Sequence, residues 1–293
     1  MALGRTIFRE VVASRLLCTK SWRSRFRQIS FSVAFLFKTM QLLLSRSHLH
    51  VLAVTVLAMA GAGCNRNSET VDEIINRNTE ARGGREAIEA VRSVAVDLHI
   101  VDPEFAVDGT YRAARPGKMR IDINAGGKQV YTEAFDGQRG WQWKGKGTET
   151  VEESPKAAAA LRHGVELPGN LYGLHELRQR GHRVVLTGRE EIDGVNYYLL
   201  QLSLDDGYAT TLYVDPNSWL ITRRRDVRPL HVDVDPTPTT IEQRMSDFRR
   251  VAGVMFPFAN TETDLKTGKI LETTTVRGIT VNPTIDARIF EKL

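Results

Sequence analysis

Residues 93–100 read Ser-Val-Ala-Val-Asp-Leu-His-Ile, and this stretch decides the fold class. Its even-numbered positions are all apolar, whereas its odd-numbered positions carry small or polar side chains. Side chains two positions apart share one face of a β-strand. The stretch therefore predicts a strand with one face against a core and the other toward solvent.

Segments with the same alternation lie farther along the chain. They cover residues 107–114, 118–124, 129–135, 140–144, 183–191, 195–204, 208–214, 219–226, 240–249 and 270–281. Short turns rich in Gly, Pro and Asp separate many of them, as at residues 115–117, 136–137 and 193–194. Links of this length are typical of antiparallel neighbours, so we expect one sheet of about ten antiparallel strands.

Helical patterns precede and interrupt the predicted strands. Thr70 and Glu73 have the spacing of a capping box, which predicts a helix over residues 71–81. Ser154-Pro155 has the character of a second helix start, and the leucine-rich residues 167–177 that follow contain two glycines, which predicts short or broken helices. One sheet cannot bury its own inner face, so we expect these helices to lie across it.

Cys64 ends the run Leu-Ala-Met-Ala-Gly-Ala-Gly-Cys, behind an apolar stretch over residues 51–62. That stretch is shorter than the roughly 20 residues of a spanning helix and suits the core of a signal peptide. The run resembles a bacterial lipobox, in which the cysteine receives a diacylglycerol, although Gly61 stands where a Leu-like residue is usual. We expect lipidation at Cys64; the alternative is a small buried thiol behind an ordinary signal peptide or membrane anchor.

The segments before Cys64 divide at Met40. Residues 40–63 form a compact signal peptide with Arg46 as its positive end. Residues 1–39 are rich in Arg and poor in acids, which is typical of an organelle transit peptide, but a start codon placed too early explains them with fewer assumptions. We therefore expect an extended N-terminus over 1–39, a tether over 64–70 and one domain over 71–293.

Charge is distributed unevenly along the chain. The whole sequence carries +5, but residues 1–63 hold nine Lys or Arg against one Glu, so the remainder carries −3. The basic character thus belongs to the leader, which argues against nucleic-acid binding. Cys18 and Cys64 are the only cysteines, so the mature domain has no internal disulfide and depends on an ordinary core.

No catalytic or metal motif stands out in the sequence. There is no G-x-S-x-G elbow, Walker loop, H-E-x-x-H or C-x-x-C pair. His231, Asp233 and Asp235 would share one face of a strand and could hold a divalent metal, but a solvated edge before the loop 236–238 explains them better. His163, His175 and His182 have irregular spacing, which is typical of surface or helix-end histidines rather than of a metal site. We expect no enzyme activity, no metal and no cofactor.

An apolar ligand site is the more specific expectation. Trp141 and Trp143 are two positions apart and share one strand face, and several leucines and a tyrosine show comparable alternation or helical spacing. The residues expected to line an apolar ligand are Trp141, Trp143, Leu171, Leu174, Tyr198, Leu200 and Leu202. The alternative for each is simple core packing. In the run Arg223–Arg225 the side chains should alternate between faces, as a solvated rim or, alternatively, a lipid-phosphate clamp.

Several stretches together resemble the LolA/LolB-like superfamily of periplasmic lipoprotein-sorting proteins. They lie at residues 81–84, 115–120, 135–141, 212–221, 248–257 and 281–290. The resemblance covers most of residues 70–293. It implies an α+β fold: a single strongly curved antiparallel sheet, or incomplete barrel, covered by a helical lid and an N-terminal helix, which holds acyl chains in an apolar cavity.

The resemblance and Cys64 together predict a function in the bacterial cell envelope. We expect a non-catalytic, periplasm-facing protein that is anchored to a membrane through Cys64 and binds an acyl chain, a lipoprotein or another apolar ligand, with a role in lipoprotein sorting. Asn65 is not the acidic residue that keeps some lipoproteins at the inner membrane, which favours the outer membrane. The alternative is a structural or sensory module that binds an envelope protein partner through the curved sheet.

Overall fold

The computed structural model describes residues 69–232 and 235–292. The predicted extended N-terminus (1–39), signal peptide (40–63) and most of the tether (64–70) lie outside this part, as does Cys64. Within the described residues, no helix combines the length and the apolar character that crossing a membrane requires.

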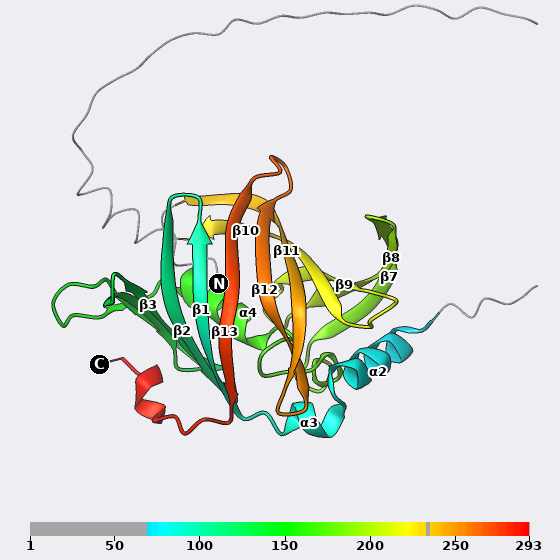
Figure 1. Cartoon of the computed structure of the whole chain (residues 1–293), viewed down its shortest axis with the longest axis horizontal. Helices are drawn as coiled ribbons and strands as arrows, with labels where there is room; N and C mark the ends of the chain where they lie inside the picture. Colours follow the sequence, from blue (N-terminus) through cyan, green and yellow to red (C-terminus); the bar gives the residue numbers. More distant parts are fainter. Residues whose placement is uncertain (1–68, 233–234, 293) are drawn as a thin grey trace, which may run out of the picture. The chain divides into compact units, whose positions relative to one another are not determined.

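The described residues form one antiparallel sheet of 13 strands (Figure 1). The strands are β1 (Ser93–Asp102), β2 (Phe105–Ala114), β3 (Lys118–Ala125), β4 (Lys128–Phe135), β5 (Gly140–Trp143), β6 (Val151–Glu152), β7 (Arg183–Ile192), β8 (Val195–Ser203), β9 (Ala209–Val214), β10 (Ile221–His231), β11 (Asp235–Val251), β12 (Val254–Asp264) and β13 (Ile270–Val281). Their order across the sheet is β6-β5-β4-β3-β2-β1-β13-β12-β11-β10-β9-β8-β7.

The strand order consists of two meanders that meet where β1 pairs with β13, near the middle of the sheet in Figure 1. The edges β6 and β7 do not pair with each other, so the sheet is open. This confirms the predicted fold class, a single antiparallel sheet that does not close into a barrel, accompanied by few helices. Two strands, β6 and β12, were missed. Pro257 lies within β12 and opposite Phe248, and a proline inside a run argues against a strand in sequence reasoning.

The first helix begins and ends where its sequence predicts. In α2 (Val71–Arg82), the amide of Glu73 donates to Thr70 Oγ1 at 3.2 Å, and the amide of Thr70 donates to Glu73 Oε2 at 2.7 Å. Gly83 then has a φ of 126°, and a Cβ there would lie 2.1 Å from the carbonyl oxygen of Gly253. Only glycine allows the β11–β12 turn to approach this closely. A short helix, α3 (Arg85–Glu89), leads into β1.

The helical insertion between β6 and β7 contains one regular helix. It is α4 (Pro155–Glu166), whose first turn is capped by Ser154 Oγ, which accepts from the amide of Ala157 at 3.1 Å. After α4 only the 3₁₀ turn η1 (Leu174–Glu176) is helical, in agreement with the predicted broken helices. A second 3₁₀ turn, η2 (Ala287–Phe290), lies near the C-terminus.

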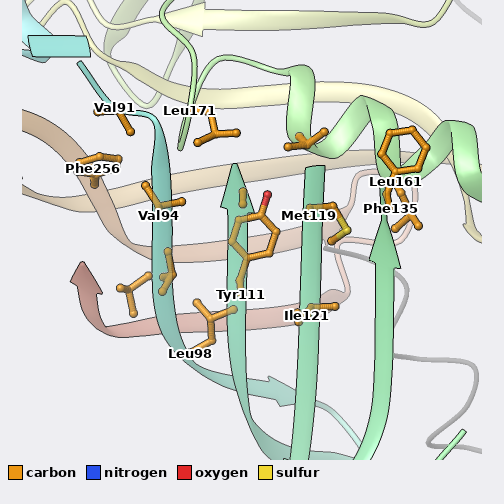
Figure 2. Packing of buried hydrophobic residues seen from close by; sticks show 14 of the residues in the cluster. Val91, Val94, Leu98, Tyr111, Met119, Ile121, Phe135, Leu161, Leu171 and Phe256 are labelled. Atoms are coloured by element: carbon orange, nitrogen blue, oxygen red, sulfur yellow. The ribbon is translucent and has the colours of Figure 1, made fainter. Parts of the chain in front are cut away.

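One face of the sheet, here called the inner face, carries α2, α4 and η1. Over β1–β4 it forms the first core, which α4 covers through Leu161 and which also includes Leu171. Figure 2 shows side chains of β1, β2, β3 and α4 pointing into this common space. Members labelled there are Val91, Val94, Leu98, Tyr111, Met119, Ile121, Phe135, Leu161, Leu171 and Phe256.

A second core lies at the other end of the inner face, over β7–β9. Helix α2 and the residues around η1 pack on these strands. Its buried members are Ile74, Ile75, Leu167, Leu174, Leu177, Val184, Tyr198, Leu200, Leu202, Leu204, Leu212 and Val214. The helical segments therefore cover the two ends of the inner face, as expected for a sheet that cannot bury itself.

Candidate functional site

Five of the seven residues expected to line a ligand lie within the two cores. Tyr198, Leu200, Leu202 and Leu174 belong to the second core and are at most 3% exposed, whereas Leu171 belongs to the first core. Each thus packs against protein in this structure. Contact of these residues with a ligand stays a prediction.

The two tryptophans lie on the outer face. Trp141 is opposite Ala134, which is opposite Arg120, and cross-strand partners share a face. The neighbouring positions 119 and 135 carry the inner-face residues of the first core. The Trp141 indole donates to the carbonyl of Phe290 at 3.0 Å, so η2 covers it. The strand register therefore places Trp141 and Trp143 on the opposite face from Leu200 and Leu202 of β8, with which they were expected to line one ligand.

The centre of the inner face is polar. The register from β8 to β12 places Leu200 opposite Leu212, Leu212 opposite Arg224, and Arg224 opposite Gln243, all on the inner face. Asp226 and Arg228 follow Arg224 on the same face of β10, and Glu262 lies opposite Gln243. The inner face is thus apolar in the first core, polar in its centre and apolar again in the second core.

A β-bulge decides which arginine reaches this centre. Ile221 is opposite Val214, but the register shifts by one residue before Arg223, which is opposite Tyr213. Ile221 packs against the second core, so regular alternation would place Arg223 on its face. The bulge instead turns Arg224 inward and leaves Arg223 and Arg225 outside. The expected alternation within Arg223–Arg225 is confirmed.

Each of the two outward arginines forms two ion pairs. Arg223 contacts Asp193 at 2.5 Å and Glu242 at 2.8 Å. Arg225 contacts Glu242 at 2.7 Å and Glu190 at 2.8 Å. Burial opposes the charge of Arg225, but Glu242 and Glu190 bind it and the Tyr213 hydroxyl accepts a hydrogen bond from it. The net effect of these contacts is to raise the pKa of Arg225.

The inward charges form a buried network. Arg228 donates to both oxygens of Glu262 at 3.0 Å, and its Nε lies 3.4 Å from Asp226. The Tyr208 hydroxyl also donates to Asp226, whose side chain is 2% exposed. Burial lowers the pKa of Arg228, but Glu262 and Asp226 outweigh it and the net shift is upward. Burial likewise raises the pKa of Tyr208, which remains a neutral donor.

A cavity of about 320 Å³ lies between α4 and this part of β10. Small residues of α4 form one wall, and the strand and the residues after it form the other. Its lining consists of Lys156, Ala159, Ala160, His163, Gly164, Leu167, Tyr208, Arg224, Val227, Arg228, Pro229, Leu230 and Val232. Leu167 also belongs to the second core, so the cavity borders that core. None of the seven predicted ligand-lining residues is among these.

The C-terminal half of α4 is fixed to the β8–β9 turn. Arg162 contacts Asp205 at 2.5 Å, and His163 Nε2 lies 2.6 Å from Asp206. The His163 ring also stacks on Tyr208 with 4.1 Å between ring centroids. These contacts hold one wall of the cavity in place relative to the sheet.

Two arginines hold the rest of the insertion. Arg82 of α2, which is buried, donates to the carbonyl oxygens of Tyr172 at 2.8 Å and Gly169 at 2.5 Å. Arg115, in the turn between β2 and β3, donates to the Leu171 carbonyl at 2.6 Å and to Glu176 Oε1 at 2.5 Å. Burial lowers the pKa of Arg82 to about 10, so it remains charged at neutral pH.

A buried carboxyl lies apart from the cavity, in the first core. Glu133 is opposite Ile121 on the inner face and is 2% exposed. Burial, followed by repulsion from Glu153, raises its pKa from 4.5 to about 8. Glu133 is therefore mostly protonated at neutral pH, and a neutral carboxyl is compatible with its apolar neighbours.

The three insertion histidines do not meet at one point. His163 pairs with Asp206, while His175 Nδ1 lies 3.2 Å from Thr79 Oγ1 and its Nε2 lies 3.3 Å from Glu89. Burial lowers the pKa of His175 and of His182, so both are neutral at neutral pH. Asp233, which was weighed with His231 and Asp235, lies outside the described residues.

His182 takes part in the cluster that most resembles a metal site within the described residues. The ligand atoms of His182, Glu166 and Asp205 all lie within 4.8 Å of one another. However, Arg162 contacts Glu166 at 3.1 Å as well as Asp205, and Arg180 lies 3.6 Å from Glu166. A divalent cation would have to displace guanidinium groups, so the donors fit an ion-pair network better than a metal.

Sequence reasoning missed most of the cavity lining. Lys156, Ala159, Ala160 and Tyr208 were not singled out, and Arg224 was noted only as part of its arginine run. The small residues over 157–160 are the one local signal that points to a close approach of the helix, and they do not say to which strand. That information comes from the position of α4 over β10.

Comparison with known proteins supports the fold. No protein-family profile matches the chain, and no curated protein matches its sequence. A solved LolA superfamily protein from Nitrosomonas europaea aligns with a TM-score of 0.50 and 16% identity over 77% of this chain and 99% of that one. A DUF1329 family protein from Desulfovibrio piger aligns with a TM-score of 0.51 and 11% identity over 76% and 98% of the two chains. This chain therefore has the fold of the LolA/LolB-like superfamily, as its sequence motifs predicted.

Proposed function

We propose that the chain is a non-catalytic binding protein of the bacterial cell envelope that holds an acyl chain or another apolar ligand. The observation that carries this proposal is the cavity between α4 and β10. Its volume of about 320 Å³ lies within the range of small-molecule sites, and its walls are mostly apolar. Each methylene buried there stabilises the complex by about 0.8 kcal/mol, which makes an acyl chain a suitable occupant.

The proposal includes the N-terminal organisation. Residues 40–63 act as signal peptide, Cys64 carries the lipid, residues 64–70 form the tether, and residues 71–293 form the binding domain, with 1–39 as an extended N-terminus. A lipid anchor keeps the cavity near a membrane that contains acylated molecules, and two or more chains give stable anchoring. The outer membrane is the favoured location, and lipoprotein sorting is the specific role we propose for this binding.

Lipid extraction and mass spectrometry of the full chain, produced in a bacterial host and purified from its membrane fraction, test the binding. We expect acylated molecules at close to one per protein. Ala160→Trp, which fills the cavity, should remove them, whereas Ala287→Trp, at an exposed position of η2, should not. A wild-type protein that carries no such molecule would contradict the proposal and favour a module that binds a protein partner.

A separate experiment tests the anchor. Cys64→Ser should move the protein from the membrane fraction to the soluble fraction and remove the mass of the lipid. An unchanged mass and an unchanged distribution would show that Cys64 is not lipidated, and would leave the cavity proposal standing.

A further inference from the structure

The cavity between α4 and β10 has an uneven distribution of charge. Its lining contains the cationic side chains Lys156, Arg224 and Arg228, and no Asp or Glu. These cations lie beside small and apolar residues such as Ala159, Ala160 and Leu230. A site that combines apolar walls with cationic side chains and lacks carboxylates matches a molecule with an apolar chain and an anionic head.

The three cations are not equally available. Arg228 is engaged by Asp226 and by both oxygens of Glu262. Arg224 has only a distant pair, with its Nε 3.9 Å from Asp226, and this buried Nε has no hydrogen-bond acceptor among the described residues. Lys156 is exposed at the start of α4, and no ion pair involves it in the described part of the chain.

The contrast with its neighbours strengthens the case for Arg224. Arg223 and Arg225 each bind two carboxylates on the outer face, although Arg223 Nε, like Arg224 Nε, has no acceptor among the described residues. Arg224 is turned inward by the bulge and is the member of the run that lines the cavity. A buried N–H without an acceptor is costly, and an anionic group in the cavity would supply one.

From these contacts we infer that the cavity selects an amphiphile with a single acyl chain and an anionic head, a carboxylate or a phosphate, held by Arg224 and Lys156. The inference rests on the proposed function and names its ligand class. The volume is near the lower end for ligand sites, which suits a single acyl chain. The small side chains of α4 at Ala159, Ala160 and Gly164 make room for that chain along the helix.

Displacement of a fluorescent fatty acid, cis-parinarate, from the full chain with Cys64→Ser, which lacks the proposed anchor, tests this selectivity in detergent-free buffer. The competitors share one saturated chain and differ in the head: palmitate, lysophosphatidate, hexadecanol and hexadecylamine. We expect the two anions to displace the probe at concentrations about tenfold or more below those of the neutral alcohol and the amine. The reason is that only the anions accept charge-assisted hydrogen bonds from the cationic side chains. The ratio between palmitate and lysophosphatidate distinguishes a carboxylate site from a phosphate site.

Three variants assign the effect to residues. Arg224→Gln and Lys156→Gln should each weaken palmitate binding about tenfold and leave hexadecanol unchanged. Arg244→Gln, on the exposed outer face opposite Arg223, removes the same charge and should change neither. Lys156 is exposed, so its variant tests the inference even where Arg224→Gln disturbs folding.

The outcomes separate this inference from the proposed function. If the alcohol competes as well as palmitate, or if both cavity variants bind palmitate like the wild type, the inferred selectivity for an anionic head is refuted. The proposed binding of an apolar chain would still stand. If neither the probe nor any competitor binds the wild type, the proposed function fails together with the inference.

Discussion

The inner face contains two kinds of surface that are built differently. At its ends, the first and second cores are apolar and sealed by helices, with Leu200 and Leu98 almost fully buried. In its centre, the buried carboxylates of Asp226 and Glu262 instead form an ion network with Arg228, which is partly exposed. The ends stabilise the fold by removing apolar area from water, whereas the centre contributes little net stability and retains polar groups beside a cavity. Most of the apolar burial and the cavity thus belong to different strands of one sheet.

Truncation in a sealed end should have the largest effect. Leu200 is fully buried in the second core, so Leu200→Ala should lower the free energy of unfolding by about 3–4 kcal/mol through lost burial and the cavity that remains. Denaturant unfolding of the full chain measures this value. Val151→Ala, at a side chain that is 53% exposed, is the control and should change it by less than about 0.5 kcal/mol. Equal losses for both variants would contradict the sealed burial of Leu200 in the second core.

The polar centre should respond to the loss of one partner more than to the loss of both. Arg228→Met leaves Asp226 and Glu262 without their main cation and should cost about 2–3 kcal/mol. Adding Glu262→Met should restore part of that loss, because the second change removes an uncompensated charge. A double-mutant cycle from unfolding curves measures the coupling. Strictly additive losses would show that the two side chains do not act as a pair.

Glu133 is an ionisable residue within the apolar ends, and the pH dependence of stability should reveal its contribution. Its pKa is about 8 in the folded protein against 4.5 ordinarily, so between these values the folded state binds more protons than the unfolded state. Its contribution to stability is therefore present at low pH and falls as pH rises toward 8. Glu133→Gln stays neutral, so the melting temperature should fall less between pH 5 and pH 8 than in the wild type. Exposed Glu149→Gln is the control; parallel curves for Glu133→Gln and wild type would refute the buried acid.

The smallest effect should come from the outer face. Arg244 is exposed and lies opposite the like charge of Arg223. Arg244→Gln should change the free energy of unfolding by less than about 0.5 kcal/mol in either direction. Denaturant unfolding at low and high salt checks this. A loss above 1 kcal/mol would mean that the outer face also carries stability.

Local patterns in the sequence predicted local structure well. The capping box at Thr70 and Glu73 fixed the start of α2 because both partners lie within one turn. Alternation predicted most strands, and ordered motifs predicted the superfamily fold. The cavity was not predictable in the same way. Which face Arg224 takes depends on a bulge set by its pairing with β9, and alternation from Ile221 gives the opposite face.

Pairing of residues far apart in the chain also escaped prediction. The face that carries Trp141 follows from the register of β4 with β5, and its burial follows from η2, near the other end of the chain. Neither has a signal in the local sequence. The residues predicted to line a ligand were therefore mostly large and apolar, whereas the cavity wall on α4 consists of small residues such as Ala159 and Ala160.

The pairing of β1 with β13 has a consequence for the order in which the chain acquires structure. The first long strand finds its second neighbour only when residues 270–281 have been made, so the centre of the sheet closes last. Contacts this distant in sequence slow folding and leave strand edges open to other chains in the meantime. A chain that stops before Ile270 would expose the edges of both β1 and β12 and should aggregate, even though either meander by itself has its hairpins in place.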